Sequence, residues 1–98
     1  MSGKEEQKVQ KKITDYLDSL GAYYLKVHGS AYQPAGTPDL LCSVNGRFVG
    51  IEVKKPKGGI VSELQKFKIK EIQNSGGIAF VANSLDVVKR EFKEHSIV

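Results

Sequence analysis

The sequence contains one cysteine, Cys42, among its 98 residues. An intrachain disulfide is therefore excluded, and neither a multi-cysteine zinc cluster nor a secreted disulfide framework is available. Long apolar runs are missing as well, because no segment approaches the roughly 18 apolar residues of a membrane span. There is no internal repeat, low-complexity tract or linker. These absences favour a soluble, cytoplasmic protein in which Cys42 is a small core residue.

The composition is that of a folded domain. Hydrophobic residues make up 40% of the chain and charged residues 27%, which lies outside the range that leaves chains disordered. The length allows one domain, residues 1–98, with one modest core. The formal net charge of +4 fits a polyanionic partner such as nucleic acid, whose phosphates lysine and arginine neutralise. The charge alone is weak support for such a partner.

Hydrophobic periodicity and turn signals divide the chain into seven elements. The predicted elements are a helix over 4–20 opened by a capping box of Ser2 and Glu5, strands over 22–27, 39–44 and 47–54, a helix opened by a capping box of Ser62 and Gln65, a strand over 78–82, and a helix capped by Asn83 or Ser84. The order αβββαβα indicates an α/β or α+β fold. The intervening segment 28–38 is a long loop for so small a domain, which indicates a functional role.

The Asn45-Gly46 turn brings two acidic residues together. A two-residue type I′ turn there sets the register of the two flanking strands. In that register Asp39 lies directly opposite Glu52, with Cβ atoms about 4.5 to 5.5 Å apart. Two like charges so placed destabilise a sheet, and a divalent cation between them compensates. Carboxylate oxygens suit Mg²⁺, which completes its shell with waters and substrate phosphate.

Lys54 joins this pair because residues two apart in a strand project from the same face. Val53, between Glu52 and Lys54, turns to the other face and leaves its backbone carbonyl available as a further metal ligand. A metal held by the acids can bind a phosphate oxygen and lower the pKa of its water, while the ammonium stabilises developing charge. The predicted chemistry is metal-assisted phosphodiester hydrolysis.

The alternative interpretation is that Asp39 simply begins a strand and that residues 52–54 belong to an exposed sheet face. Short motifs such as Glu-x-Lys occur often by chance. The apolar residues that flank both acids argue against this alternative, since they place an unpaired acidic pair beside a core. The conjunction of the acids, the lysine and the hairpin favours an active site.

Three segments carry a family resemblance: Gly36-Thr37-Pro38-Asp39, Ile51-Glu52-Val53-Lys54-Lys55-Pro56, and Ser62 to Gln65. With these segments the chain resembles the VRR-Nuc (virus-type replication-repair nuclease) branch of the PD-(D/E)xK superfamily over nearly its whole length. The resemblance implies a restriction-endonuclease-like αβββαβ core with a central mixed sheet, dependence on Mg²⁺ or Mn²⁺, and cleavage of DNA. Stand-alone viral and bacterial members are similar to Holliday-junction resolvases, which implies a phage or prophage protein.

The resemblance also implies roles for individual residues. Asp39 and Glu52 would be metal ligands, Lys54 the catalytic lysine, and Gln65 a group that positions water or phosphate. The family has a glutamate in its first helix, where this chain offers both Glu5 and Glu6. Helical phase favours Glu6, which lies about 35° from the centre of the apolar stripe against about 65° for Glu5. Glu5 remains the alternative.

The predicted function is a metal-dependent endodeoxyribonuclease acting on branched DNA, which the resemblance implies would leave 5′-phosphate and 3′-hydroxyl ends. A restriction-like or degradative nuclease acting on linear DNA and a catalytically silent DNA-binding module are the alternatives. Because one chain carries one set of catalytic residues, a symmetric homodimer is expected, with its surface at 31–35 or on the first helix. Some lysines of the set 55, 57, 66, 68 and 70 are expected to contact the DNA backbone, whereas lysines 4, 8, 11 and 12 are typical of a solvated helix face.

Overall fold

Seven elements follow one another in the predicted order. In the computed structural model they are α1 (Gly3–Ser19), β1 (Tyr23–Lys26), β2 (Leu40–Val44), β3 (Arg47–Val53), α2 (Glu63–Asn74), β4 (Ile78–Ala82) and α3 (Leu85–Glu94). The structure describes residues 3–27 and 34–98, so Ser2 and residues 28–33 of the predicted long loop lie outside the described residues. Within the described part of the chain, no helix is both long and apolar enough to cross a membrane.

The four strands form one mixed sheet in the order β1-β2-β3-β4. The first three strands are antiparallel, and β4 joins β3 in parallel after the crossover through α2. Val44 pairs with Arg47 across the hairpin turn, as predicted. Asn45 and Gly46 have φ of 49° and 78°, the two positive values that a type I′ turn requires. The predicted register and fold class are therefore confirmed.

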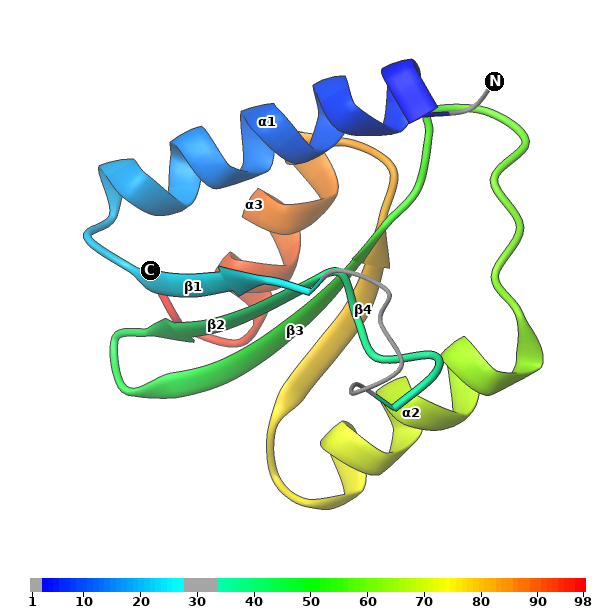
Figure 1. Ribbon diagram of the computed structural model, residues 1–98. Coiled ribbons are helices and arrows are strands. Elements are labelled where there is room, and N and C mark those ends of the chain that lie inside the picture. The colour runs from blue at the N-terminus through cyan, green and yellow to red at the C-terminus, as the bar shows by residue number, and fades with distance from the viewer. Residues whose placement is uncertain (1–2, 28–33) are drawn as a thin grey trace.

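One face of the sheet carries the core. Helices α1 and α3 lie together over this face, whereas α2 lies on the opposite side (Figure 1). Val9, Ile13 and Leu17 of α1 are buried at helical spacing, and the ring of Phe92 in α3 packs edge-on against Phe80 with centroids 6.4 Å apart. The strand residues that alternate toward this face are fully or almost fully buried: Leu40, Cys42, Val44, Val49, Ile51 and Val53. Cys42 is thus a core residue, as predicted.

The opposite face is only partly covered. Helix α2 packs over β3 and β4, and it approaches closely because Gly50 has no side chain: a Cβ there would lie 3.0 Å from Cδ1 of Ile72. No residue of α2 is fully buried. Toward β1 the same face exposes Tyr23, Leu25 and Phe48 by 68%, 53% and 50%. The sheet therefore has a sealed core side and an open side that bears the site described next.

Candidate active site

The two acids stand together at one end of the hairpin. Leu40 and Ile51 are the last paired residues of β2 and β3, and extension of this register by one residue places Asp39 opposite Glu52. Asp39 Oδ2 accepts a hydrogen bond of 2.8 Å from the backbone N–H of Val53. Because that N–H belongs to the strand that carries Glu52, the bond fixes one carboxylate beside the other.

Glu52 is a buried acid with one unpartnered oxygen. Its residue is 2% exposed, and the structure describes no hydrogen-bond partner for its Oε1. Burial, together with the negative charge of Asp39, raises the pKa of the Glu52 carboxyl to about 8 despite the opposing effect of Lys54. A buried carboxylate oxygen without a hydrogen-bond partner is costly, so Oε1 requires a proton or a cation.

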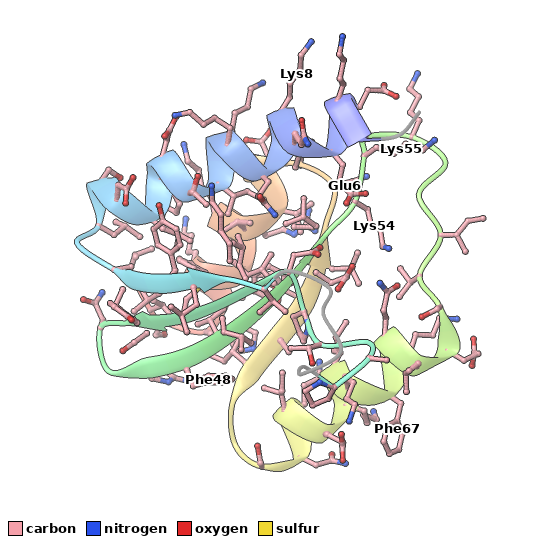
Figure 2. All side chains as sticks on the ribbon, in the orientation of Figure 1. Glu6, Lys8, Phe48, Lys54, Lys55 and Phe67 are labelled. Atoms are coloured by element: carbon pink, nitrogen blue, oxygen red, sulfur yellow. The ribbon has the colours of Figure 1, made fainter. Side chains whose placement is uncertain are left out.

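Lys54 and Gln65 bind the other oxygen of Glu52. Lys54 Nζ lies 3.4 Å from Glu52 Oε2, and Gln65 Nε2 donates a hydrogen bond of 3.0 Å to the same atom. Lys54 Nζ also donates to Gln65 Oε1 at 3.1 Å. In Figure 2 the Lys54 side chain projects from the end of β3 toward α2. The structure thus brings together Asp39, just before β2, Glu52 and Lys54 at the end of β3, and Gln65 of α2.

Two glycines allow the surrounding segments to approach this cluster. Gly36 has φ of 84°, and a Cβ there would lie 2.8 Å from Cγ of Leu64, so the loop before Asp39 packs directly on the first turn of α2. A Cβ on Gly59 would lie 2.9 Å from Cβ of Lys54. Gly36 belongs to the Gly36-Thr37-Pro38-Asp39 motif, but its contact with Leu64 was not predicted from the sequence. The sequence feature that could have indicated this contact is a glycine three residues before Asp39.

Glu6 lies near the cluster without joining it. Its side chain points from the first turns of α1 toward the end of β3, where Lys54 begins (Figure 2). Glu6 is half-buried and Glu5 is exposed, in keeping with the predicted helical phase. However, within residues 3–27 and 34–98 no three His, Cys, Asp or Glu side chains are close enough together to hold a metal ion. A catalytic role for Glu6 therefore stays a prediction.

The donor set fits a hard divalent cation. Asp39 and Glu52 offer two carboxylates, and the unpartnered Oε1 of Glu52 is the kind of atom that a cation satisfies. Mg²⁺ binds through one or two carboxylates and fills its other positions with water and phosphate, so a third acid is not needed. The Val53 carbonyl as a further ligand, and the metal itself, stay predictions.

Two lysines of the set expected to contact DNA are paired with neighbouring acids. Lys66 is paired with Glu63 at 3.0 Å and Lys68 with Glu71 at 3.3 Å, which lowers their value as phosphate contacts. Lys8 points away from the sheet on the outer side of α1, as expected for a solvated face (Figure 2). Lys55 follows Lys54 and is half-buried, and Lys57 is exposed on the loop that leads to α2; lysines 55 and 57 thus lie beside the site.

The sheet and the cluster together define a class of protein. A mixed four-stranded sheet is flanked by helices, and its central hairpin ends in an Asp, a Glu and a Lys on one face. This is the PD-(D/E)xK type of architecture that the sequence predicted.

Comparison with known proteins narrows the class. No family model matches the sequence, and no curated protein matches it. A solved structure described as "VRR_NUC domain" superposes with a TM-score of 0.77 and 28% identity, covering 93% of this chain and 96% of the other. A second, "VRR_NUC domain protein", shares the fold with a TM-score of 0.67 and 23% identity over 90% and 88% of the two chains. This likeness supports a VRR-Nuc domain in the chain, and the predicted family resemblance is confirmed.

Proposed function

We propose that this VRR-Nuc domain is a metal-dependent endodeoxyribonuclease that prefers branched DNA such as a four-way junction. The observation that carries the proposal is the buried Glu52 beside Asp39, with an oxygen that lacks a partner within the described residues. A buried acid beside a second, half-buried acid does not stabilise a fold, because the two like charges repel and burial disfavours the charged form. A site for Mg²⁺ or Mn²⁺ explains why the pair is there.

Each residue of the cluster has a task in phosphodiester hydrolysis. Water adds to phosphorus, the bond to the 3′ oxygen breaks, and this leaving oxygen takes a proton, which yields 5′-phosphate and 3′-hydroxyl ends. When bound, the divalent ion supplies a Lewis acid for the phosphate and a lowered pKa for water. Asp39, Glu52 and the Val53 carbonyl hold that ion. Lys54 places its ammonium where negative charge develops on the phosphate, and Gln65 holds the ammonium there.

Two further groups complete the proposal. Glu6, which points from α1 toward the end of β3, orients water at the edge of the site. Lys55 and Lys57 neutralise phosphates of the DNA backbone on either side of the scissile bond, which contributes affinity without sequence preference.

The test compares metal binding and cleavage in matched variants. Asp39→Asn should lose most of its affinity for Mn²⁺ in a calorimetric titration and should not cleave DNA. Asp15→Asn is the control, because Asp15 is exposed on α1 and is paired with the exposed Lys11, away from the cluster. Unchanged Mn²⁺ affinity in Asp39→Asn would contradict the metal site. Wild-type protein that binds DNA but cleaves none with either ion would indicate a silent binding module.

Substrate preference and assembly are tested together. A single chain carries one cluster and cuts one strand, whereas resolution of a four-way junction needs two symmetric cuts, so we propose a homodimer as the active species. Linear, flap and four-way DNA of matched sequence should be cut with four-way DNA preferred. Equal cleavage of all three by a monomer would instead support a degradative nuclease.

We propose a dimer surface other than the two that were expected from the sequence. The apolar residues of α1 pack in or against the core, so the first helix has no apolar face left to offer, and most of 31–35 lies outside the described residues. Tyr23, Leu25 and Phe48 form an uncharged, exposed patch on a chain of net charge +4, and we place the dimer surface there. Sedimentation of the wild type should give twice the 10.8 kDa chain mass, and Phe48→Glu should give the mass of the monomer. Ile60→Glu is the control, because Ile60 is a loop residue that is 83% exposed, and this variant should remain a dimer.

A further inference from the structure

The first turn of α2 is closed by a reciprocal capping box. Ser62 is the N-cap residue, and its Oγ accepts a hydrogen bond of 3.1 Å from the backbone N–H of Gln65. In return, the backbone N–H of Ser62 donates a hydrogen bond of 2.9 Å to Oε1 of Gln65. Such a box normally serves only to satisfy the free N–H groups of a helix start. Here its glutamine is also part of the candidate active site.

The amide group of Gln65 is held at both ends. Its Oε1 accepts from the Ser62 N–H and from Lys54 Nζ, while its Nε2 donates to Oε2 of Glu52. A backbone N–H and an ammonium can only donate, so the amide end that faces them must be the oxygen. Glu52 Oε2 also faces the Lys54 ammonium at 3.4 Å and therefore acts as an acceptor, so the other end of the amide is the NH₂. All three partners therefore require the same amide orientation.

We propose that Ser62 is a positioning residue for this site and that its backbone N–H sets the orientation of the Gln65 amide. The oriented amide in turn holds the Lys54 ammonium beside Glu52. The consequence for reaction rate rests on the proposed nuclease function, whereas the effect on Gln65 does not.

The alternative arrangement explains why the N–H matters. Without it, Oε1 of Gln65 retains Lys54 as its one described partner, and the amide can rotate about its last torsion angle. Lys54 Nζ already lies 3.4 Å from Glu52 Oε2, so a released ammonium would close on the carboxylate and leave the position of the scissile phosphate. A displacement of about 1 Å in a catalytic group lowers rates by as much as 10²-fold. The N–H of Ser62 acts against this collapse.

Two substitutions separate the N–H from the hydroxyl. Ser62→Ala removes the hydroxyl cap and keeps the N–H, whereas Ser62→Pro removes both. Proline suits this position because Ser62 has φ of −71°. The carbonyl of Ser62, which accepts from the Lys66 N–H at 3.0 Å, is present in both variants. The comparison of proline with alanine therefore isolates the bond to Gln65.

The first measurement needs no DNA and no metal. In NMR spectra of the metal-free protein, the side-chain NH₂ signals of Gln65 should keep their position in Ser62→Ala and shift in Ser62→Pro. Equal spectra for the two variants would overturn the proposal. If the proline variant does not fold, a synthetic chain with an ester in place of the peptide bond between Val61 and Ser62 removes the same N–H without a ring, and it should reproduce the shift.

The second measurement uses single-turnover cleavage and DNA affinity. We expect Ser62→Pro to be slower than Ser62→Ala by about tenfold or more, with DNA affinities within about twofold of each other. Equal rates in the two variants would reduce Ser62 to an ordinary helix cap. Loss of rate together with an equal loss of DNA affinity would also contradict a positioning role. Wild-type protein without any cleavage would refute the proposed function, while the NMR comparison would still decide the role of Ser62.

Discussion

Replacing Glu52 with glutamine should stabilise the domain, and the gain should grow with pH. The Glu52 carboxyl is 2% exposed and has a pKa of about 8, against an ordinary value of 4.5. Because the folded state retains the proton that the unfolded state has released, stability present below pH 4.5 is lost as the pH rises toward about 8. Glutamine is neutral at every pH and has nearly the same shape.

The magnitude follows from proton linkage. A pH of 7 lies about 2.5 units above the pKa of 4.5 that the carboxyl has in the unfolded chain, and each unit corresponds to about 1.36 kcal/mol. The free energy of unfolding of Glu52→Gln should therefore exceed that of the wild type by roughly 3 kcal/mol at pH 7. Near pH 4.5 the two proteins should be almost equally stable. The amide oxygen of the new side chain can still accept from Gln65, and its NH₂ can donate to Asp39. The described contacts of the carboxyl are therefore kept.

The assay is urea unfolding in EDTA at several pH values between 4.5 and 8. Glu63→Gln is the control, because Glu63 is exposed and is paired with the exposed Lys66, so its effect should not grow with pH. With Mn²⁺ in place of EDTA the order of stability should reverse at pH 7, since an ion at about 1,000 times its dissociation constant adds about 4.1 kcal/mol to the wild type alone, more than the gain of roughly 3 kcal/mol. A difference between wild type and Glu52→Gln that does not change with pH would refute the argument.

Three further outcomes follow from the structure. Lys54→Ala should lower the single-turnover rate by about 10² or more with little change in DNA affinity, whereas Lys57→Ala, at an exposed residue, should weaken DNA binding and keep the rate. Equal losses of rate and affinity in Lys54→Ala would mean that Lys54 only binds phosphate. Gly36→Ala should lower the free energy of unfolding by about 1 to 3 kcal/mol. The loss should exceed that of Gly21→Ala, because Gly21 has a similar positive φ but nothing within 4 Å of a new Cβ. Equal losses in chemical denaturation would contradict the contact between Gly36 and Leu64. Burial raises the pKa of the Cys42 thiol to about 12, so Cys42 should react with an alkylating reagent only as fast as the protein unfolds. Mass spectrometry at pH 8 in increasing urea can follow the labelling, and rapid labelling of the folded protein would contradict the burial of Cys42.

Local chemistry determined much of this molecule. The Asn45-Gly46 turn admits positive φ at two consecutive residues, which set the register and placed Asp39 across from Glu52. The spacing of Ser62 and Gln65 predicted a capping box at the start of α2, and the structure contains it. These features were predictable because turns, caps and strand register depend on residues close together in the chain.

Tertiary structure decided how the acids differ and what holds them. Glu52 is buried, and α2 brings Gln65, 13 residues further along the chain, to its Oε2, whereas its Oε1 is buried without a hydrogen-bond partner among the described residues. No pattern in the sequence indicates that the glutamine of a helix cap also binds Lys54, since this depends on where the helix packs on the sheet. That placement depends on Gly36 and Gly50, whose missing side chains let α2 approach. Packing distances of this kind arise from all the elements together, which is why the sequence could predict the candidate site residues but not their contacts.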